Sequence, residues 1–339
     1  MTSRELVLRT LEFENKDGRV PRDMWVLPWA GMHYPVELSA IQRDFPGDFF
    51  TPDPCIKEKG VSEGDAYKLG RHIDAWGCIF ENKAEGYVGE VKEAIVSVED
   101  EESDWDDTSR VHFPLEWLGM DVGQINAQCR ASDKFAFAAA CPRPFEQLQF
   151  IRTTEQLYMD LALLPPGLTR FIGRMHGFYC DLLEKWAKTE VDALNIMDDW
   201  GSQNSLLIDP AMWRRIFKPL YKDYIDIAHR AGKKIFMHSD GHILSIYPDL
   251  IELGLDAINS QLFCMGLENL KPFAGKITFY GEIDRQNILP YASVDEVKAA
   301  VCSVRETLWA DGGAIAQCEF GVGAKPENVR AVYEAWAKT

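Results

Sequence analysis

The sequence has 339 residues, of which 46% are hydrophobic, and a formal net charge of −17. A chain of this length can bury a large core, and α/β barrels of this size are often single domains. The negative charge repels phosphate backbones, so we exclude a nucleic-acid partner. No apolar run approaches the roughly 20 residues that a membrane span needs, so we expect no membrane partner. We expect a cytoplasmic protein with reduced thiols, since its cysteines are scattered and form no C-x-x-C pair.

Strand-like and helix-like segments alternate along the chain, after an amphipathic helix at the N-terminus. Apolar runs indicate strands at residues 20–28, 134–141, 192–200, 233–238, 255–262, 276–281 and 313–318. Helical spacing and helix-start signals mark residues 166–189, 210–231, 293–309 and 325–337. Near-continuous apolar strands that alternate with helices are typical of parallel βαβ units.

These units predict an α/β fold, a (β/α)8 TIM barrel, with residues 1–339 forming one domain. The eighth strand is not visible in residues 30–130, which are irregular and rich in insertions. This region contains an acidic run at 97–107, which we expect to be a solvated loop or hairpin.

Polar side chains begin where several of the predicted strands end. Catalytic residues of a TIM barrel lie at the C-terminal ends of different strands, so we expect these side chains to share one mouth. They are Asp198, Asp199, His238, Asp240, Gln261, Glu282, Asp284, Cys318 and Glu319.

Three of these residues have metal-ligand chemistry and follow different strands. His238, Glu282 and Cys318 are separated by about one βα repeat each. Imidazole, carboxylate and thiolate are all zinc ligands, and a catalytic zinc keeps three protein ligands and an open position. The three residues therefore predict a metal site. Asp240 competes with Glu282 as the oxygen ligand. The alternative is a metal-free pocket in which Asp240 or Asp199 bonds to His238.

Asp198 and Asp199 are adjacent, so on a strand their side chains face opposite sides. Only one of them can point into the barrel, while the other can cap the following turn. We expect at least one of the two to bind substrate or to handle a proton.

Several segments occur together that suggest a family. They are RVPRDMWVLPWAG at 19–31, DDWG at 198–201, GKKIFMHSDG at 232–241, GEID at 281–284 and KPENVRAVYEA at 325–335. Together they resemble the uroporphyrinogen decarboxylase superfamily over most of the chain. The resemblance implies a (β/α)8 barrel. It also implies one of two activities, because the superfamily contains the decarboxylase and zinc-dependent methyltransferases that exchange methyl groups with a corrinoid protein, coenzyme M or a folate.

The decarboxylase branch carries an Arg-Gln-Ala-Gly-Arg stretch after its first strand, whose arginines bind the carboxylates of its substrate. At that place this sequence reads Pro-Trp-Ala-Gly-Met, residues 28–32, so both arginines are absent. Without these donors, and with a net charge of −17, a substrate with many carboxylates has no obvious anchor.

The methyltransferase branch carries a His-x-Cys motif and a second Cys further along the chain. Here His238 is followed by Asp240 in place of the first Cys, and Cys318 matches the second. The resemblance therefore implies zinc at His238 and Cys318 with an oxygen as third ligand. We favour Glu282 for that place, because it ends its own strand and has the longer side chain.

Replacing a thiolate by a carboxylate makes a zinc site harder and a stronger Lewis acid toward oxygen. The leading hypothesis is therefore a zinc-dependent methyltransferase. It would move a methyl group from an O-methyl donor, such as an aromatic methyl ether, to the cob(I)alamin of a corrinoid protein. Asp199 and Asp240 are the expected catalytic residues. The expected substrate contacts are Trp29, Asp198, Trp200, Gln261 and Tyr280.

Two other functions stay open. One is a metal-free decarboxylase of the same fold, and the other is a non-catalytic barrel that binds a small ligand. The resemblance also implies that the chain can form a homodimer, because many barrels of the superfamily pair.

Overall fold

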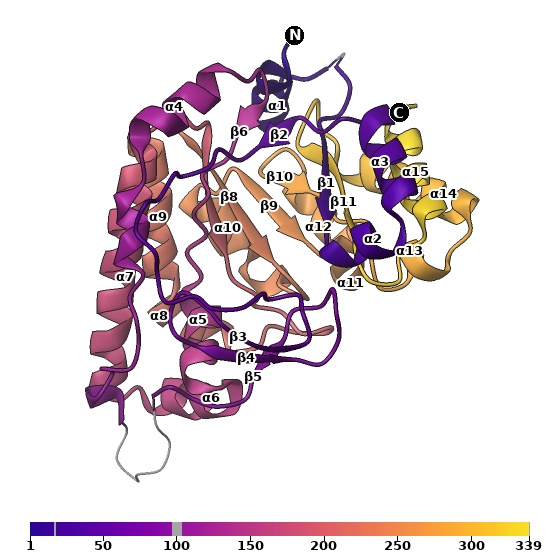
Figure 1. The fold of residues 1–339 in the computed structure, drawn as a ribbon. Coiled ribbons are helices and arrows are strands. Elements are labelled where there is room, and N and C mark those ends of the chain that lie inside the picture. The colour runs from indigo at the N-terminus through magenta and orange to yellow at the C-terminus, as the bar shows by residue number, and fades with distance from the viewer. Residues whose placement is uncertain (17, 97–103, 339) are drawn as a thin grey trace.

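The computed structural model describes residues 1–16, 18–96 and 104–338, so most of the acidic run at 97–107 lies outside the described residues (Figure 1). In the described residues, eight parallel strands form a ring. They are β1 (Arg22–Val26), β2 (Phe49–Phe50), β6 (Phe135–Ala136), β7 (Ala193–Met197), β8 (Lys234–Ser239), β9 (Ala257–Ser260), β10 (Thr278–Tyr280) and β11 (Ala314–Phe320).

The ring is closed by backbone contacts between all neighbouring strands. Six strands form one sheet in the order β1-β11-β10-β9-β8-β7, and β2 pairs with β6. A parallel bridge between Phe137 and Ala193 joins β6 to β7. The N–H of Asp48 donates to the carbonyl of Arg22 at 2.8 Å and joins β2 to β1. The predicted (β/α)8 barrel is confirmed, and the strand missed by sequence analysis is β2, only two residues long.

Helices follow the strands in chain order, with the long ones lying along the sides of the ring (Figure 1). They are α2 (Pro28–His33), α3 (Pro35–Asp44), α4 (Val122–Arg130), α5 (Pro144–Arg152), α6 (Thr154–Leu163), α7 (Pro166–Ala187), α8 (Pro210–Ile216), α9 (Lys218–Arg230), α10 (Tyr247–Leu253), α11 (Leu262–Met265), α12 (Leu267–Leu270), α13 (Ile288–Tyr291), α14 (Val294–Leu308) and α15 (Pro326–Trp336). The helices predicted at 166–189, 210–231, 293–309 and 325–337 are confirmed, except that 210–231 is broken into α8 and α9 next to Pro219. Within the described ranges, no helix is long and apolar enough to cross a membrane.

The two ends of the barrel differ. Helix α1 (Ser3–Leu11) closes the N-terminal end, where Val7 and Leu11 pack against the apolar residues that fill the ring. At the opposite end lies an antiparallel sheet from the insertion, formed by β3 (Gly70–Ile73), β4 (Ile79–Asn82) and β5 (Glu90–Val91) (Figure 1). The strand ends that carry the polar residues are therefore covered by the insertion.

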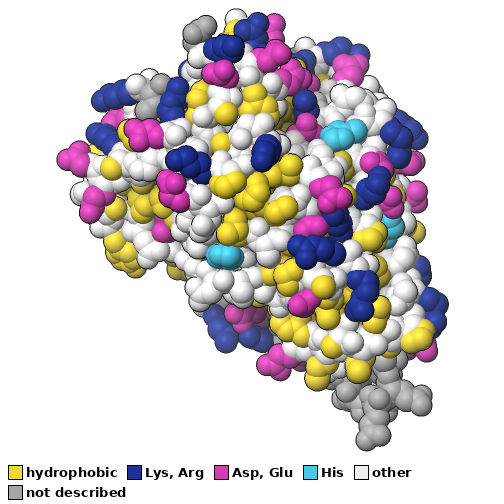
Figure 2. All heavy atoms as spheres, turned by 180° about the vertical axis from the view of Figure 1, so that it is seen from behind, with side chains coloured by type: hydrophobic (Ala, Val, Ile, Leu, Met, Phe, Trp, Pro, Cys, Tyr) yellow, Lys and Arg dark blue, Asp and Glu magenta, His cyan; other side chains and the backbone are white. Residues whose placement is uncertain are grey.

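Charges of both signs are mixed on the outer surface. Figure 2 shows Lys and Arg side chains interspersed with Asp and Glu on the face turned away from the view of Figure 1. In the part of the chain that is described, this face presents no continuous basic surface of the kind that binds nucleic acid.

The loops that follow β7 and β8 cross at two glycines. The N–H of Gly201 donates to the carbonyl of Asp240 at 3.0 Å. Gly241 has a φ of +78°, and a Cβ there would lie 2.1 Å from the carbonyl oxygen of Gly201. The N–H of Asp240 also donates to Oδ1 of Asp199 at 3.0 Å. This crossing fixes how the two strand ends lie relative to one another.

We expect Gly241→Ala to destabilise the protein by roughly 3 kcal/mol, because it combines left-handed strain with a backbone clash. Gly232→Ala is the matched control: Gly232 has a φ of +67° but open space around its Cβ position. It should cost only about 1 kcal/mol. Chemical denaturation measures both free energies of unfolding, and equal losses would contradict the importance of the crossing.

Candidate metal centre and active site

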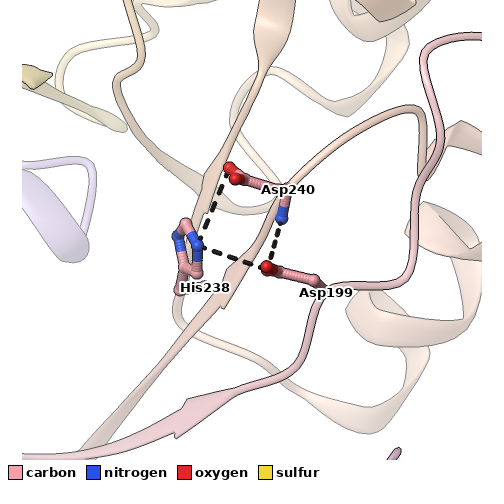
Figure 3. Close-up of side chains that lie close together, drawn as sticks. All are labelled: Asp199, His238 and Asp240. Carbon is pink, nitrogen blue, oxygen red and sulfur yellow. Dashed lines mark hydrogen bonds and ion pairs between the residues drawn. The ribbon is translucent and has the colours of Figure 1, made fainter. Parts of the chain in front are cut away.

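Three side chains at the ends of β7 and β8 converge on one point (Figure 3). Nε2 of His238 lies 3.4 Å from Oδ1 of Asp199 and 3.7 Å from Oδ1 of Asp240. One potential ligand atom from each residue lies within 4.8 Å of the others. This spacing is that of side chains able to hold one metal ion.

The imidazole of His238 is oriented by Asn259. Nδ1 of His238 lies 2.6 Å from Oδ1 of Asn259, whose Nδ2 donates to the carbonyl of Tyr280 at 2.6 Å. Because the amide nitrogen is engaged by a carbonyl, the amide oxygen must accept, and Nδ1 carries the proton. Nε2 is then the nitrogen that faces the two aspartates, as in metal-binding histidines whose other nitrogen donates to an oxygen. Trp25 packs on the ring, with 5.1 Å between centroids.

Charge decides the protonation of this group. Burial opposes protonation of His238, but the hydrogen bond and charge of Asp199, together with the charge of Asp240, raise its pKa to about 9. Burial alone would raise the pKa of Asp199, yet its bond to His238 lowers it. Without a metal, the pair is therefore an imidazolium and a carboxylate at neutral pH, and metal binding must release the imidazolium proton.

The donors fit a divalent metal ion. Oδ1 of Asp240, the oxygen that faces Nε2 of His238, is buried and has no hydrogen-bond partner among the described residues, and the same holds for Oε2 of Glu282. A buried carboxylate oxygen without a partner is costly, and a cation would satisfy it. One imidazole nitrogen and carboxylate oxygens are ligands that zinc and harder divalent metals accept.

Arg285 joins a second group of carboxylates to this cluster. Its guanidinium contacts the Asp240 carboxylate and lies 3.5 Å from Oε1 of Glu282 and 3.2 Å from Oε2 of Glu319. Burial raises the pKa of Glu282 to about 8, and it also raises the pKa of Glu319. Sequence analysis noted Glu319 only as a strand-end residue and gave Arg285 no role. Glu319 lies two residues after Gln317 and four after Ile315 on β11, so the three side chains share the face of the strand that points into the ring. This alternation could have identified Glu319 if the facing side of the strand had been known.

Cys318 lies apart from the cluster. It is fully buried, and its Sγ is 3.6 Å from the hydroxyl of Tyr333 on α15, outside the ring. Burial raises the pKa of its thiol to about 12. Neighbouring strand residues face opposite sides, so Glu319 points toward the mouth while Cys318 points outward. The predicted set of His238, Glu282 and Cys318 is therefore not assembled; the residues gathered around His238 are Asp199 and Asp240.

Two predicted substrate contacts have structural partners instead. Asp198 is fully buried and caps α5, accepting from the N–H groups of Phe145 and Glu146 at 2.9 and 2.7 Å and from the Tyr221 hydroxyl at 2.6 Å. Trp200 is also fully buried, stacked on Phe145 with 4.1 Å between centroids. Both side chains therefore pack into the protein and hold the loop that carries Asp199. Of the adjacent pair Asp198 and Asp199, only Asp199 reaches the site.

The other three predicted contacts lie in different places. Trp29, on α2, stacks on His33 with 4.4 Å between centroids. Gln261 lines a cavity of about 140 Å³ together with Glu282 and Arg285. Tyr280 lines a second cavity, inside the ring, together with His238 and Asn259.

The cluster lies between two cavities. An outer cavity of about 890 Å³, between the mouth and the insertion, is reached by Asp199 and Asp240. Its aromatic walls are Trp76, Phe80, Trp117, Phe150, Tyr179 and Trp186. An inner chamber of about 240 Å³ lies within the ring and is lined by His238 and Asn259. Cys141 lines both cavities. A small molecule at the cluster therefore has space on either side.

Comparison with protein families gives a match to the model described as "Uroporphyrinogen decarboxylase (URO-D)" over residues 93–339, more than half of the chain. The chain belongs to the uroporphyrinogen decarboxylase family. The resemblance expected from the sequence is thus confirmed. A search of curated proteins gives no match.

Solved structures with a similar fold include a methyltransferase from Methanosarcina mazei. It is 14% identical, the match covers 100% of this chain and 99% of that one, and the TM-score is 0.67. At this identity the similarity is one of fold. Two xylanases match more weakly. The Gloeophyllum trabeum enzyme has a TM-score of 0.46, 9% identity and coverage of 95% and 97%. The Thermotoga petrophila enzyme has a TM-score of 0.45, 11% identity and coverage of 100% and 98%.

In the metal-free protein we expect His238 to titrate with a pKa of about 9. Asp199→Asn should lower this pKa by roughly one unit or more, because it removes the strongest favourable partner. Since the folded-state pKa exceeds the ordinary value of 6.5, the stability that this pair contributes is fully present below pH 6.5 and is lost as the pH rises through 9. NMR of the imidazole signals measures the pKa.

Asp223→Asn is the control for this titration, because Asp223 pairs with His176 on the outer helices. It should leave the titration of His238 unchanged. A His238 pKa near 6.5 in the unsubstituted protein would contradict the electrostatic description of the cluster.

Proposed function

We propose that this protein is a zinc-dependent methyltransferase that takes a methyl group from an O-methyl compound, probed best with aromatic methyl ethers, and passes it to the cob(I)alamin of a corrinoid protein. The observation that carries the proposal is a mostly buried imidazole whose Nε2 faces two carboxylates. One of these carboxylates has an oxygen without a hydrogen-bond partner among the described residues. Family membership and the methyltransferase among the structural neighbours support the choice of reaction.

Zinc would be held by Asp199, His238 and Asp240. Glu282 adjoins this group through Arg285, which contacts both Asp240 and Glu282. When bound, it would supply a Lewis acid for the ether oxygen that keeps its electrons as the methyl group leaves. This proposal keeps the zinc and His238 of the sequence-based hypothesis. It replaces the ligands Glu282 and Cys318 by Asp199 and Asp240.

The chain's own residues perform the positioning. Asn259 holds His238 with Nε2 toward the aspartates. Arg285 binds Oδ2 of Asp240 and leaves Oδ1 facing His238, so Asp240 presents a single oxygen. The positive charge of Arg285 offsets three carboxylates that would otherwise repel one another. It would also reduce their repulsion of the negative charge that develops on the departing oxygen.

The two cavities suit two reactants of different size. The methyl acceptor is large, and the outer cavity of about 890 Å³ is the wider space beside the cluster. Both aspartates line that cavity, so a methyl group attached to an oxygen at the cluster can face it. The arrangement thus supports transfer outward, from a donor at the cluster to an acceptor in the outer cavity.

Metal analysis of the purified protein should give about one zinc per chain. His238→Ala and Asp240→Asn should each abolish most of this zinc, because each removes a ligand. His176→Ala, which changes a histidine on α7, and Cys318→Ala, which changes a thiol outside the ring, should retain it. Loss of zinc in Cys318→Ala with retention in Asp240→Asn would overturn the ligand set.

Asn259→Ala should weaken zinc binding roughly 10- to 100-fold, because it releases the partner that orients the imidazole. Asn195→Ala is the matched control: its amide also lines the inner chamber, but donates to the carbonyl of Ala138 at 3.1 Å. Competition with a chromophoric chelator measures both affinities. Equal affinities in the two variants would show that Asn259 does not act through His238.

The activity is tested by methylation of cob(I)alamin across a panel of methoxylated aromatics, followed by the absorbance of the cobalamin. We expect turnover with at least one donor, and a loss of at least about 100-fold in His238→Ala. Zinc-loaded protein that methylates cob(I)alamin with none of the donors would contradict the proposed reaction.

A further inference from the structure

A partly buried acid inside the ring has no part in the proposed metal site. Asp23, on β1, lines the inner chamber. Its Oδ1 accepts from the N–H of Met24 at 3.0 Å, and its Oδ2 accepts from Nε1 of Trp25 at 3.2 Å and from the hydroxyl of Tyr280. All of these donors are neutral. Burial raises the pKa of this carboxyl.

Carboxylates that are largely removed from water are normally paired with a cation or a metal. Among the described residues, the ion pairs of the ring include none for Asp23, whereas Asp199, Asp240, Glu282 and Glu319 each face a cationic group. Three neutral donors leave Oδ1 with capacity for one more hydrogen bond. Asp23 is therefore placed to accept a donor from a molecule in the chamber.

Asp23 and His238 lie at different depths of the chamber and on opposite sides of the ring. Strands β1 and β8 are four positions apart in the eight-stranded order. The Trp25 ring reaches the His238 ring across the barrel. Asp23 precedes Trp25 by two residues on the same face, which places it about 7 Å deeper along the strand. The chamber thus runs from the metal-site imidazole down to a carboxylate.

The size and walls of the chamber fit a single aromatic ring. Its volume is about 240 Å³, and an apolar cavity of about 150 Å³ is enough for benzene. The walls between His238 and Asp23 include the rings of Phe49, Phe137 and Phe236. Aromatic walls favour edge and face contacts with another ring.

We propose that the inner chamber binds the ring of the methyl donor, and that Asp23 selects donors that carry a hydroxyl or an ammonium group at the end away from the methoxy group. The methoxy oxygen then lies at the His238 cluster, while the donor group binds Asp23. The assignment of the methoxy end rests on the proposed function, but ring binding and selection by Asp23 can be tested without methyl transfer.

The first experiment measures binding of toluene, phenol and benzylammonium to the purified full chain by calorimetry. Phenol, benzylammonium or both should bind at least about tenfold more tightly than toluene, because a hydrogen bond to a carboxylate is charge-assisted. The stronger of the two identifies hydroxyl or ammonium as the preferred group. In Asp23→Asn and Asp23→Ala this preference should fall to less than about threefold.

Asp198→Asn is the matched control, because Asp198, like Asp23, is an acid that accepts from a tyrosine hydroxyl and from backbone N–H, but it lies outside the chamber. It can cost stability, yet it should keep the preference for phenol or benzylammonium. Circular dichroism verifies that each variant is folded. If an Asp23 variant does not fold, Trp25→Phe, which removes one donor to Asp23, should change the preference and serves in its place.

Three results would overturn the proposal: none of the probes binds, toluene binds as tightly as the other two, or the preference survives in a folded Asp23 variant. The proposed function fails separately. If phenol binds in a manner that depends on Asp23 but neither 4-methoxyphenol nor 4-methoxybenzylamine methylates cob(I)alamin, then the chamber binds rings and the methyl transfer is wrong.

Discussion

The hydrogen bond between His238 and Asn259 is the interaction on which the candidate site depends. The amide of Asn259 is held by the carbonyl of Tyr280, so its oxygen faces Nδ1 of the imidazole. This arrangement determines which nitrogen carries the proton, and it leaves Nε2 for the two aspartates. His238, Asn259 and Tyr280 lie on three neighbouring strands, β8, β9 and β10. The pairing register of these strands therefore determines the tautomer of His238.

Several acidic side chains surround this nitrogen. They form two regions, which differ in the cationic group that offsets their negative charge. Asp199 is balanced by His238 in the absence of a metal, whereas Asp240, Glu282 and Glu319 share Arg285. A divalent ion would replace the imidazolium proton as the positive charge of the first region and leave Arg285 with the second. Oδ1 of Asp240 and Oε2 of Glu282 have no hydrogen-bond partner among the described residues, and Asp240 belongs to both regions, because it faces His238 as well as Arg285. The carboxylates of this cluster repel one another, and the binding of a cation would relieve that repulsion.

Sequence reasoning identified the barrel because strand and helix periodicities are local properties. It missed β2, since a strand of two residues has no periodicity. It selected His238, Asp199 and Asp240 from positions at strand ends. For β11 it chose Cys318 as a ligand and gave Glu319 no role, because a shift of one residue reverses which side chain faces the mouth. Arg285 lies in a loop, where side-chain direction follows from tertiary contacts alone. Asn259 and Asp23 lie inside strands and resemble ordinary polar interruptions until the ring closes around them.

The division of space at the mouth gives the site a direction. An aromatic ligand in the inner chamber can bring only the end nearest the mouth to His238. Its other end meets Asp23 and the apolar residues that pack on α1. The aspartates, in contrast, face the outer cavity. A bond broken at the cluster therefore separates a part that stays among aromatic walls from a part that leaves through the wider space. This geometry suits the proposed methyl transfer to a large acceptor, whereas a decarboxylase with a single bound substrate has no need of two spaces.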